Sequence, residues 1–151
     1  MSASSQPTAP WGHARAVTVA DLTFDVATAG PDDGAPVMLL HGFPESNAQW
    51  RSVAAQLADA GHRVIAPNLR GYSSAARPQG VENYSIDELV GDVIGLLDAL
   101  DIERAHLVGH DWGGTIGWFA AIRHPERFAT YTAVSTAHPK ACLLYTSPSP
   151  R

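Results

Sequence analysis

The sequence predicts an α/β fold in which helices flank a mostly parallel sheet. Short apolar runs of strand length alternate with longer segments of helical periodicity, the order that parallel strands and crossover helices produce. Several of these runs are continuously apolar, as strands buried on both faces are. Gly, Pro, Asn and Asp residues at the boundaries of these segments signal turns.

The order of the segments predicts a hairpin followed by three strand–helix–strand units. Residues 16–19 and 22–29 alternate between apolar and polar positions, and Pro31-Asp32-Asp33-Gly34 is a turn signal. The expected strands cover residues 16–19, 22–29, 36–40, 63–66, 105–109 and 129–135, and the expected helices cover residues 47–60, 86–100 and 111–123.

The first two helices carry boundary signals and an apolar face. Gly61 stands where the C-terminal cap of the first helix belongs. The second helix opens with a capping box from Ser85 to Glu88. Spacings of three and four place the apolar positions of each helix on one face. These positions are Trp50, Val53, Ala54 and Leu57 in the first helix, and Ile86, Leu89, Val90, Val93, Ile94, Leu97 and Leu100 in the second.

Composition limits the classes of function. The 151 residues are 45% hydrophobic and carry a formal net charge of −5 without a long run of one sign, unlike the basic patches of nucleic-acid-binding proteins. No apolar run reaches the roughly 18 residues of a membrane span, and residues 1–13 are expected to be a flexible N-terminus without a secretory signal. Cys142 is the only cysteine, so no disulfide framework is expected. We expect a cytoplasmic protein that binds a small molecule, but neither nucleic acid nor a membrane.

Residues 142–151 break the composition of the preceding chain. Their sequence, Cys-Leu-Leu-Tyr-Thr-Ser-Pro-Ser-Pro-Arg, matches the translation of a transposon-type sequencing adapter. Segments of this kind are excluded from fold reasoning. We therefore expect the domain to occupy residues 14–141 and to be truncated after about its sixth strand.

The segment Gly109-His110-Asp111-Trp112-Gly113-Gly114 joins a buried strand directly to a helix. This is the context of a nucleophile elbow, whose sharp turn needs small neighbours. The central Asp111 is ionised at neutral pH, and a helix N-terminus favours its anion further. Its attack on a saturated carbon with a leaving group gives a stable alkyl ester, so epoxides and alkyl halides are the expected substrates. The alternative is that Asp111 only caps the helix.

The loop His41-Gly42-Phe43-Pro44 lies between the first buried strand and the first helix. In this architecture that loop supplies one backbone N–H of an oxyanion hole, and the residue after the nucleophile supplies the other. The expected donors are Phe43 and Trp112, each typically worth about 3 kcal/mol. The expected substrate-binding residues are His41, Phe43, Pro44 and Trp112, with His41 chiefly a structural part of the loop.

With these motifs the sequence resembles the epoxide hydrolase branch of the α/β-hydrolase family from Ala14 to Lys140. The segment from Asn68 to Ser73 is similar to the family's Asp-x-Arg-Gly-Tyr-Gly loop. It departs at Asn68, which removes a possible charge pair with Arg70, and at Ser73. The resemblance implies the α/β-hydrolase fold, a cis peptide before Pro44, and a cap domain that this sequence does not include.

The resemblance leaves two alternatives to an epoxide hydrolase. Haloalkane dehalogenases often carry Asn at the position of Phe43, which has no halide donor, although the Trp112 indole N–H could serve as one. Fluoroacetate dehalogenases carry Arg at the position of Trp112, where it binds the substrate carboxylate. Trp112 cannot do this, so a fluoroacetate dehalogenase is not expected. Haloalkane dehalogenase is therefore the alternative enzyme, and a non-catalytic ligand-binding homologue is the alternative of another class.

The remaining catalytic residues are expected outside this sequence, since the chain order of the fold is nucleophile, acid, then His. The 151-residue chain is therefore expected not to turn over. No metal cluster or nucleotide motif is present, so no metal and no cofactor are expected. The residues not assigned a catalytic role are His62, His106 and His124, expected to be solvated at element ends; His110, expected to pack; His138, near the family's active-site mouth; and Tyr72, Tyr84 and Tyr131, which lie outside a cap.

Overall fold

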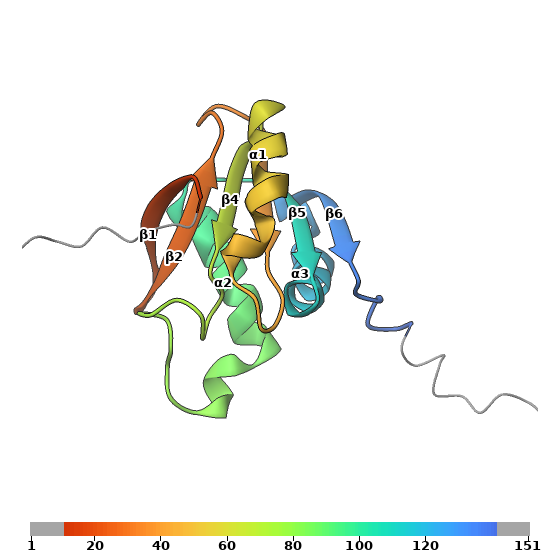
Figure 1. The fold of residues 1–151 in the computed structure, drawn as a ribbon. Coiled ribbons are helices and arrows are strands. Elements are labelled where there is room, and N and C mark those ends of the chain that lie inside the picture. The colour runs from red at the N-terminus through yellow and green to blue at the C-terminus, as the bar shows by residue number, and fades with distance from the viewer. Residues whose placement is uncertain (1–10, 142–151) are drawn as a thin grey trace, which may run out of the picture.

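The computed structural model describes residues 11–141. The expectations for residues 1–10 and 142–151, including the adapter-derived tail, lie outside the described residues. The described part of the chain forms a six-stranded sheet with three α-helices (Figure 1). The elements are β1 (His13–Val19), β2 (Leu22–Ala29), β3 (Pro36–Leu40), α1 (Arg51–Asp59), β4 (Arg63–Pro67), α2 (Ile86–Ala99), β5 (Ala105–His110), α3 (Trp112–Arg123) and β6 (Phe128–Val134), with 3₁₀ turns at Asn47–Trp50, Val81–Tyr84 and Pro125–Arg127.

The sheet is mixed and mostly parallel, in the order β1-β2-β4-β3-β5-β6. The first hairpin adds antiparallel strands, whereas β4, β3, β5 and β6 run parallel. The chain goes from β3 to β4 on one side, then crosses back to β5 on the other side of β3. This confirms the predicted fold class and places a topological switch point between β3 and β5, where open α/β sheets form a crevice.

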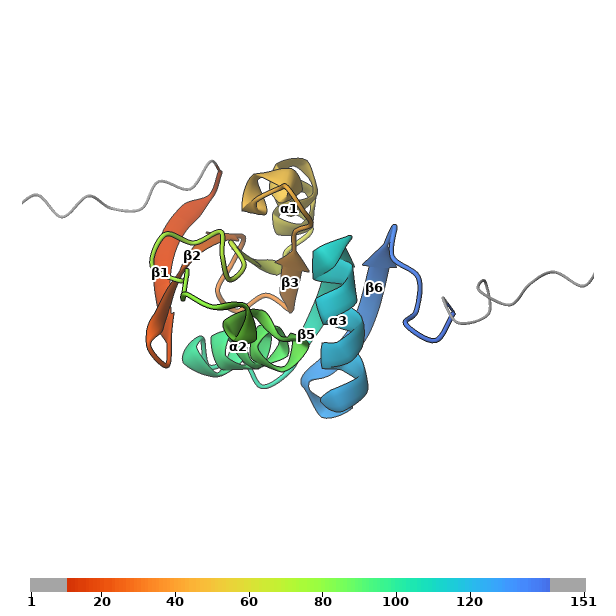
Figure 2. The same cartoon turned by 90° about the horizontal axis from the view of Figure 1, so that it is seen from below.

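The three strand–helix–strand crossovers put helices on both faces of the sheet. Figure 2 shows α1 on one face and both α2 and α3 on the other. The larger core lies under α2 and α3, where Phe24, Met38 and Leu107 are fully buried. A smaller core lies under α1, where Trp50 and Ala54 pack on Leu39. Apolar burial on both faces explains why the central strands are continuously apolar.

The first predicted helix differs from the structure at its start and on one flank. Residues 47–50 form a 3₁₀ turn, and the α-helix begins only at Arg51. Val53 was expected on the buried face but is 41% exposed. Its position is at the edge of the apolar face, and among the described helices α1 alone covers this side of the sheet (Figure 2). Gly61 has φ +87° after the helix end, as the predicted cap requires.

Ordered contacts begin before the expected domain start at residue 14. The Trp11 indole N–H donates a 2.9 Å hydrogen bond to the Asn47 carbonyl, and its ring packs against the smaller core. Strand β1 starts at His13, in register with Thr28. The part of the expected flexible N-terminus that the structure describes is therefore joined to the sheet.

The predicted capping box of α2 is only half formed. The Ser85 hydroxyl accepts from the Glu88 N–H, but the Glu88 carboxylate turns away and pairs with Arg70 at 3.0 Å. Arg70 also donates two short bonds to the buried Asp92 carboxylate. The Arg70 guanidinium thus has two carboxylate partners on α2. It is therefore paired even though Asn68 carries no charge.

Both departures from the family-like loop are accommodated by hydrogen bonds. The Asn68 side-chain oxygen accepts from the Asn47 N–H at 2.9 Å. The buried Ser73 hydroxyl donates to the Asn68 carbonyl and accepts from the Asp25 N–H. Ser73 therefore links this loop to β2, and both Asn68 and Ser73 are satisfied by hydrogen bonds within this chain.

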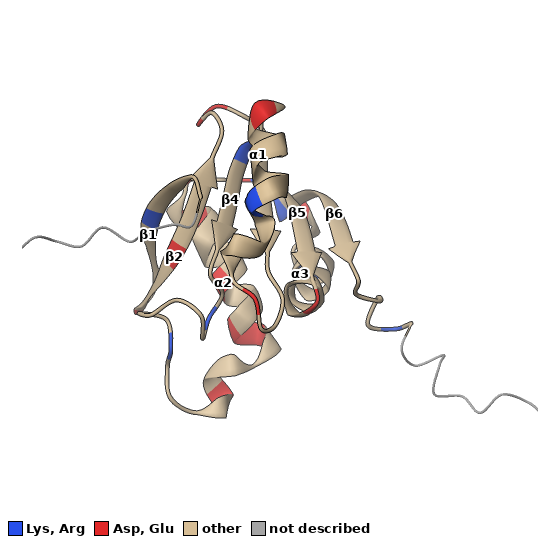
Figure 3. Cartoon of the chain, viewed as in Figure 1, with Lys and Arg blue, Asp and Glu red and all other residues tan. Residues whose placement is uncertain are grey.

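Charged side chains are spread over many elements of the described chain. Lys and Arg positions lie on β1, α1, β4 and the loops, interspersed with Asp and Glu (Figure 3). Among the described helices, none has the length and hydropathy to cross a bilayer.

Two glycines of α2 provide a matched test of the packing between this helix and β1. A methyl group at exposed Gly91 meets no atom within 4 Å, so Gly91→Ala should stabilise the fold by about 1 kcal/mol through helix propensity. A methyl group at Gly95 would collide with the Val19 side chain, so Gly95→Ala should cost about 1–2 kcal/mol. Urea unfolding of both variants checks this, and equal shifts would contradict the packing.

Candidate active site

The candidate site lies at the carboxyl ends of β3 and β5. These strands are neighbours and parallel, with Leu40 opposite Gly109. The loop after β3 and the turn after β5 therefore leave the sheet side by side at the switch point. This juxtaposition brings Phe43 against Asp111, although 68 residues separate them in the sequence.

Asp111 has a backbone conformation that L-residues rarely adopt. Its φ is 51° and its ψ is −117°, between the end of β5 and the first residue of α3. Such a conformation costs about 1–3 kcal/mol and persists only where the surroundings enforce it. Asp111 occupies the N-cap position, but its side chain does not make the usual capping bond to an N–H within the first turn of the helix. Its carboxylate instead accepts from Phe43, which lies outside the helix.

The Asp111 carboxylate is bonded instead by the predicted oxyanion-hole amides. The Phe43 N–H donates to Oδ1 at 2.9 Å. Hydrogen bonds from the backbone N–H groups of Phe43 and Trp112 lower the pKa of Asp111, and the nearby His110 contributes in the same direction. The side chain is exposed and ionised, so a negatively charged oxygen faces the open side of the elbow.

Small residues permit this close approach. A Cβ at Gly42 would lie 2.6 Å from the Asp111 Cβ, and one at Gly113 would collide with the Leu40 carbonyl. The Thr136 hydroxyl, which contacts Gly114, donates to the Asp111 carbonyl at 3.2 Å. The glycines around the elbow thus leave room for the Asp111 side chain, the Leu40 carbonyl and the Thr136 side chain, as the prediction of small neighbours requires.

His41 lies beneath the site and does not face it. Its ring is fully buried, with Nε2 accepting from the Leu69 N–H at 3.0 Å. Nδ1 therefore carries the proton and donates to the Gly42 carbonyl at 2.9 Å. Burial lowers the pKa of His41, which keeps the ring neutral. The expectation that His41 contacts substrate is thus corrected, because its ring has no exposed surface, while its structural role in the loop agrees with the contacts.

The other loop residues are open to solvent. Phe43 is 65% exposed and Trp112 is 55% exposed, and the peptide bond between Phe43 and Pro44 is cis, as the resemblance implied. Two hollows meet at Trp112. An apolar hollow of about 200 Å³ is lined by Phe43, Leu69, Arg70, Tyr72, Tyr84, Leu89, Trp112 and Ile116. A hollow of about 390 Å³ is lined by Asp111, Trp112, Thr115, Phe119, Ser135, Thr136, Ala137 and Pro139.

Comparisons with known proteins agree with this geometry. The family model described as the alpha/beta hydrolase fold matches residues 35–150. The chain belongs to the α/β-hydrolase family. The AB hydrolase superfamily protein YfhM of Bacillus subtilis is 44% identical over 118 residues, which cover 78% of this chain and 41% of that protein. Epoxide hydrolase A of Mycobacterium tuberculosis is 45% identical over 129 residues, which cover 84% of this chain and 40% of that protein.

Solved structures show the same relationship. One from epoxide hydrolases found in metagenomes of hot environments superimposes with a TM-score of 0.84 at 37% identity. It covers 91% of this chain and 47% of that chain. This α/β-hydrolase chain thus spans less than half the length of the relatives that it matches.

Sequence reasoning missed several residues of this α/β-hydrolase site. It singled out neither Thr136 nor the apolar wall formed by Leu89 and Ile116. For the loop after β6, the only signal in the sequence was His138, which the resemblance placed near the active-site mouth. Leu89 and Ile116 carried no functional signal, because a helix residue that faces a hollow has the same periodicity as one that faces the core.

The titratable residues without an assigned role lie in varied environments. His62 and His106, expected to be solvated, are half-buried with rings 6.4 Å apart, and His106 shares a 2.8 Å bond with Thr130. His138 packs edge-on against Trp118, and its Nδ1 accepts from the Lys140 N–H. The buried Nδ1 of His110 has no hydrogen-bond partner. The Tyr84 hydroxyl donates to the Pro78 carbonyl. The Tyr131 hydroxyl donates to the Gly114 carbonyl, and burial raises the pKa of Tyr131 to about 12.

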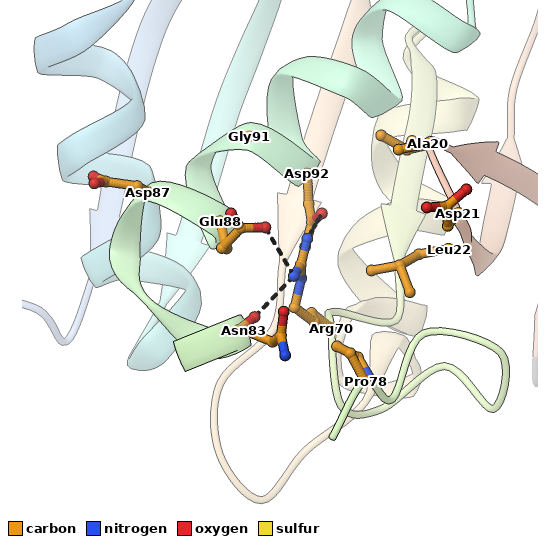
Figure 4. Close-up of a pocket in the computed structure, with 11 residues that line it drawn as sticks. Ala20, Asp21, Leu22, Arg70, Pro78, Asn83, Asp87, Glu88, Gly91 and Asp92 are labelled. Carbon is orange, nitrogen blue, oxygen red and sulfur yellow. Dashed lines mark hydrogen bonds and ion pairs between the residues drawn. The ribbon is translucent and has the colours of Figure 1, made fainter. Parts of the chain in front are cut away.

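A further hollow of about 410 Å³ surrounds Arg70, between the β1–β2 hairpin and α2. In Figure 4 the guanidinium points toward Glu88 and Asp92, and dashed lines mark its bonds to them and to Asn83. Its charges are mutually paired, which indicates that this cluster joins the loop to α2. The hollows at Trp112 are therefore the candidate active site.

The strain at Asp111 predicts an unusual order of variant stabilities. Glycine adopts positive φ without penalty, whereas alanine keeps the strain. Asp111→Gly should therefore be about 1–2 kcal/mol more stable than Asp111→Ala. Both variants lose the bond from Phe43, so that loss cancels in the comparison. Urea unfolding at pH 7 measures the difference, and equal stabilities would exclude strain at this position.

The amide bonds to Asp111 predict a low titration midpoint. A free Asp side chain titrates near about 3.9, and the Asp111 pKa is lower because two N–H groups stabilise its anion. The stabilisation is present above the unfolded-state pKa and is lost as the pH falls through the folded-state value. Carbon-13 NMR of the carboxyl groups should show a midpoint below 3.9 that disappears in Asp111→Asn. A midpoint above 4 in the folded protein would contradict the geometry.

Proposed function

We propose that this chain is the nucleophile-bearing part of an epoxide hydrolase. The observation that carries the proposal is an ionised carboxylate on a strained elbow, with two backbone amides directed at it. The names of several relatives, such as epoxide hydrolase A of Mycobacterium tuberculosis, support the same activity.

The proposed first step forms an ester on Asp111. A carboxylate oxygen attacks an epoxide carbon, the ring C–O bond breaks, and its electron pair goes to the ring oxygen, which takes a proton from solvent water. The carboxylate needs no base for this step because it is already ionised. The product is a hydroxyalkyl ester of Asp111, and no atom is lost from the epoxide.

The proposed second step uses the amides of Phe43 and Trp112. Water adds to the ester carbonyl carbon, and the negative charge develops on the oxygen that the Phe43 N–H contacts, with the Trp112 N–H as the proposed second donor. The bond between that carbon and the substrate oxygen then breaks. The diol leaves and the Asp111 carboxylate is restored. This step needs a base to deprotonate the water.

We propose that the 151-residue chain stops at the ester. Among the described histidines, His41 is buried with both nitrogens bonded, and the Nδ1 atoms of His110 and His138 are respectively buried and bonded. His62 and His106 lie at the starts of β4 and β5, at the opposite end of the sheet from Asp111. None of these rings is placed to activate water at the ester carbon.

Alkyl halides are the second candidate substrates. Displacement of a halide would form the same kind of ester, and the exposed Trp112 indole is available near Asp111. Phe43 offers no side-chain donor to a departing halide. Epoxides therefore remain the first candidate, because the oxygen freed by ring opening takes a proton and stays in the adduct, whereas a departing halide needs a donor that Phe43 does not offer.

Intact-mass analysis of the full chain tests the proposal. Incubation with a terminal epoxide should add one whole epoxide mass at Asp111, identified by peptide mapping and released by hydroxylamine as an ester. An adduct at Cys142 would be a thioether and would survive this treatment. Asp111→Asn should lose the labile adduct, because an amide is a poor nucleophile, whereas Asp59→Asn on the exposed end of α1 should keep it.

Two outcomes would overturn parts of the proposal. A labile adduct that persists in Asp111→Asn would exclude this residue as the nucleophile. Repeated turnover to diol by the wild-type chain would show that it contains a base and does not stop at the ester.

A further inference from the structure

Thr136 lies where the chain turns back toward the elbow after β6. Ser135, the first residue after the strand, has φ +53°, a conformation that persists in L-residues only where the surroundings enforce it. The turn places the Thr136 hydroxyl 3.2 Å from the Asp111 carbonyl oxygen and 3.2 Å from the Val134 carbonyl oxygen. Two residues with strained backbones, Asp111 and Ser135, are thus joined through one hydroxyl group.

Thr136 is itself held by α3. The Trp118 indole N–H donates to the Thr136 carbonyl at 3.3 Å. The Thr136 side chain packs on Gly114, where an added Cβ would lie 2.7 Å from the Thr136 Cβ. The side chain is half-buried and lines the same hollow as Asp111. These contacts keep the hydroxyl beside the elbow.

The Asp111 carbonyl belongs to the same peptide group as the Trp112 N–H. Among the described residues only the bond before Pro44 is cis, so in this trans peptide the carbonyl and the N–H point in opposite directions within one plane. A donor that fixes the carbonyl on one side therefore fixes the direction of the N–H on the other. The Trp112 N–H stabilises the Asp111 anion. Because Trp112 is the first residue of α3, this N–H has no acceptor within the helix.

The Asp111 carbonyl accepts from two donors. The Thr115 N–H donates at 2.9 Å, as the first hydrogen bond of α3. An N-cap residue ordinarily has an extended backbone, whereas Asp111 has φ 51°, so this peptide is not held in the usual way. The Thr136 hydroxyl adds a donor from outside the helix. Because hydrogen bonds in a chain polarise one another, it also makes the N–H of the same peptide a stronger donor.

We propose that Thr136 is a positioning residue of this site. Its hydroxyl donates to the Asp111 carbonyl and thereby directs the Trp112 N–H at the carboxylate. Once an ester has formed, the same N–H is directed at the oxygen that becomes negative when the ester carbonyl is attacked. The first role concerns the resting protein and needs no substrate. The second rests on the proposed function, since it assigns Thr136 to the breakdown of the Asp111 ester.

Thr136→Val and Thr136→Ser separate the hydroxyl from the bulk of the side chain. Valine has nearly the same shape but no donor, whereas serine keeps the donor. In Thr136→Val, carbon-13 NMR should show the Asp111 carboxyl titrating at a higher pH than in the wild type, because the Trp112 N–H is less well directed at the anion. Thr136→Ser should retain the wild-type midpoint. Thr132→Val makes the same change at an exposed threonine of β6 and should leave the midpoint unchanged.

The rate at which hydroxylamine releases the Asp111 adduct tests the second role. Its nitrogen bonds to the ester carbonyl carbon, the bond from that carbon to the substrate oxygen breaks, and that oxygen leaves in the diol after taking a proton from the nitrogen. The carboxylate becomes a hydroxamate.

Thr136→Val should slow this release by about 10-fold, less than the roughly 10²–10³-fold effect of removing an oxyanion donor. Ester formation should not slow, because weaker amide bonds leave the carboxylate no less nucleophilic. Thr136→Ser and Thr132→Val should release the adduct at the wild-type rate. In urea, where the site is unfolded, all four chains should release it at one rate.

The outcomes separate the two proposals. An unchanged midpoint and an unchanged release rate in Thr136→Val would overturn the positioning role, and so would equal effects of Thr136→Val and Thr136→Ser. If the wild-type chain forms no ester at Asp111, the proposed function fails, while the midpoints still decide whether Thr136 orients the Trp112 N–H. If Thr136→Val does not fold, Thr136→Ala, which removes the hydroxyl without adding bulk, decides by the same measurements.

Discussion

The geometry of the candidate active site depends on the contact between two strand–helix turns, one after β3 and one after β5. The Phe43 N–H donates a hydrogen bond to the Asp111 carboxylate. Gly42 allows the two turns to approach this closely because it has no Cβ, which would collide with the Asp111 side chain. This contact requires β3 and β5 to be parallel neighbours. The strained backbone of Asp111 is maintained because glycines, carbonyl groups and the Thr136 hydroxyl surround it on all packed sides.

A second layer of hydrogen bonds holds the loop after β3 from below. Neutral His41 joins its own loop, through the Gly42 carbonyl, to the loop after β4, through the Leu69 N–H. Asn68 extends this connection to Asn47 at the start of the turn before α1. Because the buried ring is satisfied at both nitrogens, it fixes the position of the Phe43 amide without carrying charge.

Electrostatics and burial divide the two sides of Trp112. On one side an exposed carboxylate is kept ionised by backbone amides at a helix N-terminus. On the other side the walls are formed by apolar side chains such as Leu89 and Ile116. The cation in that lining, Arg70, is paired with the carboxylates of α2. Glu88 therefore pairs with Arg70 and does not complete the capping box, and Arg70 has two carboxylate partners on α2 although position 68 carries no charge.

The sequence alone determined the order of elements, the mostly parallel sheet, the elbow at Asp111 and the loop at Phe43, since these depend on local periodicity and turn chemistry. It did not determine the exposure of Val53, the burial of both His41 nitrogens, the partners of Glu88 or the apolar hollow at Leu89 and Ile116. Those depend on contacts between segments far apart in the chain. Periodicity distinguishes an inward from an outward face, but only the folded structure decides whether an inward side chain meets core atoms, a partner charge or an open hollow.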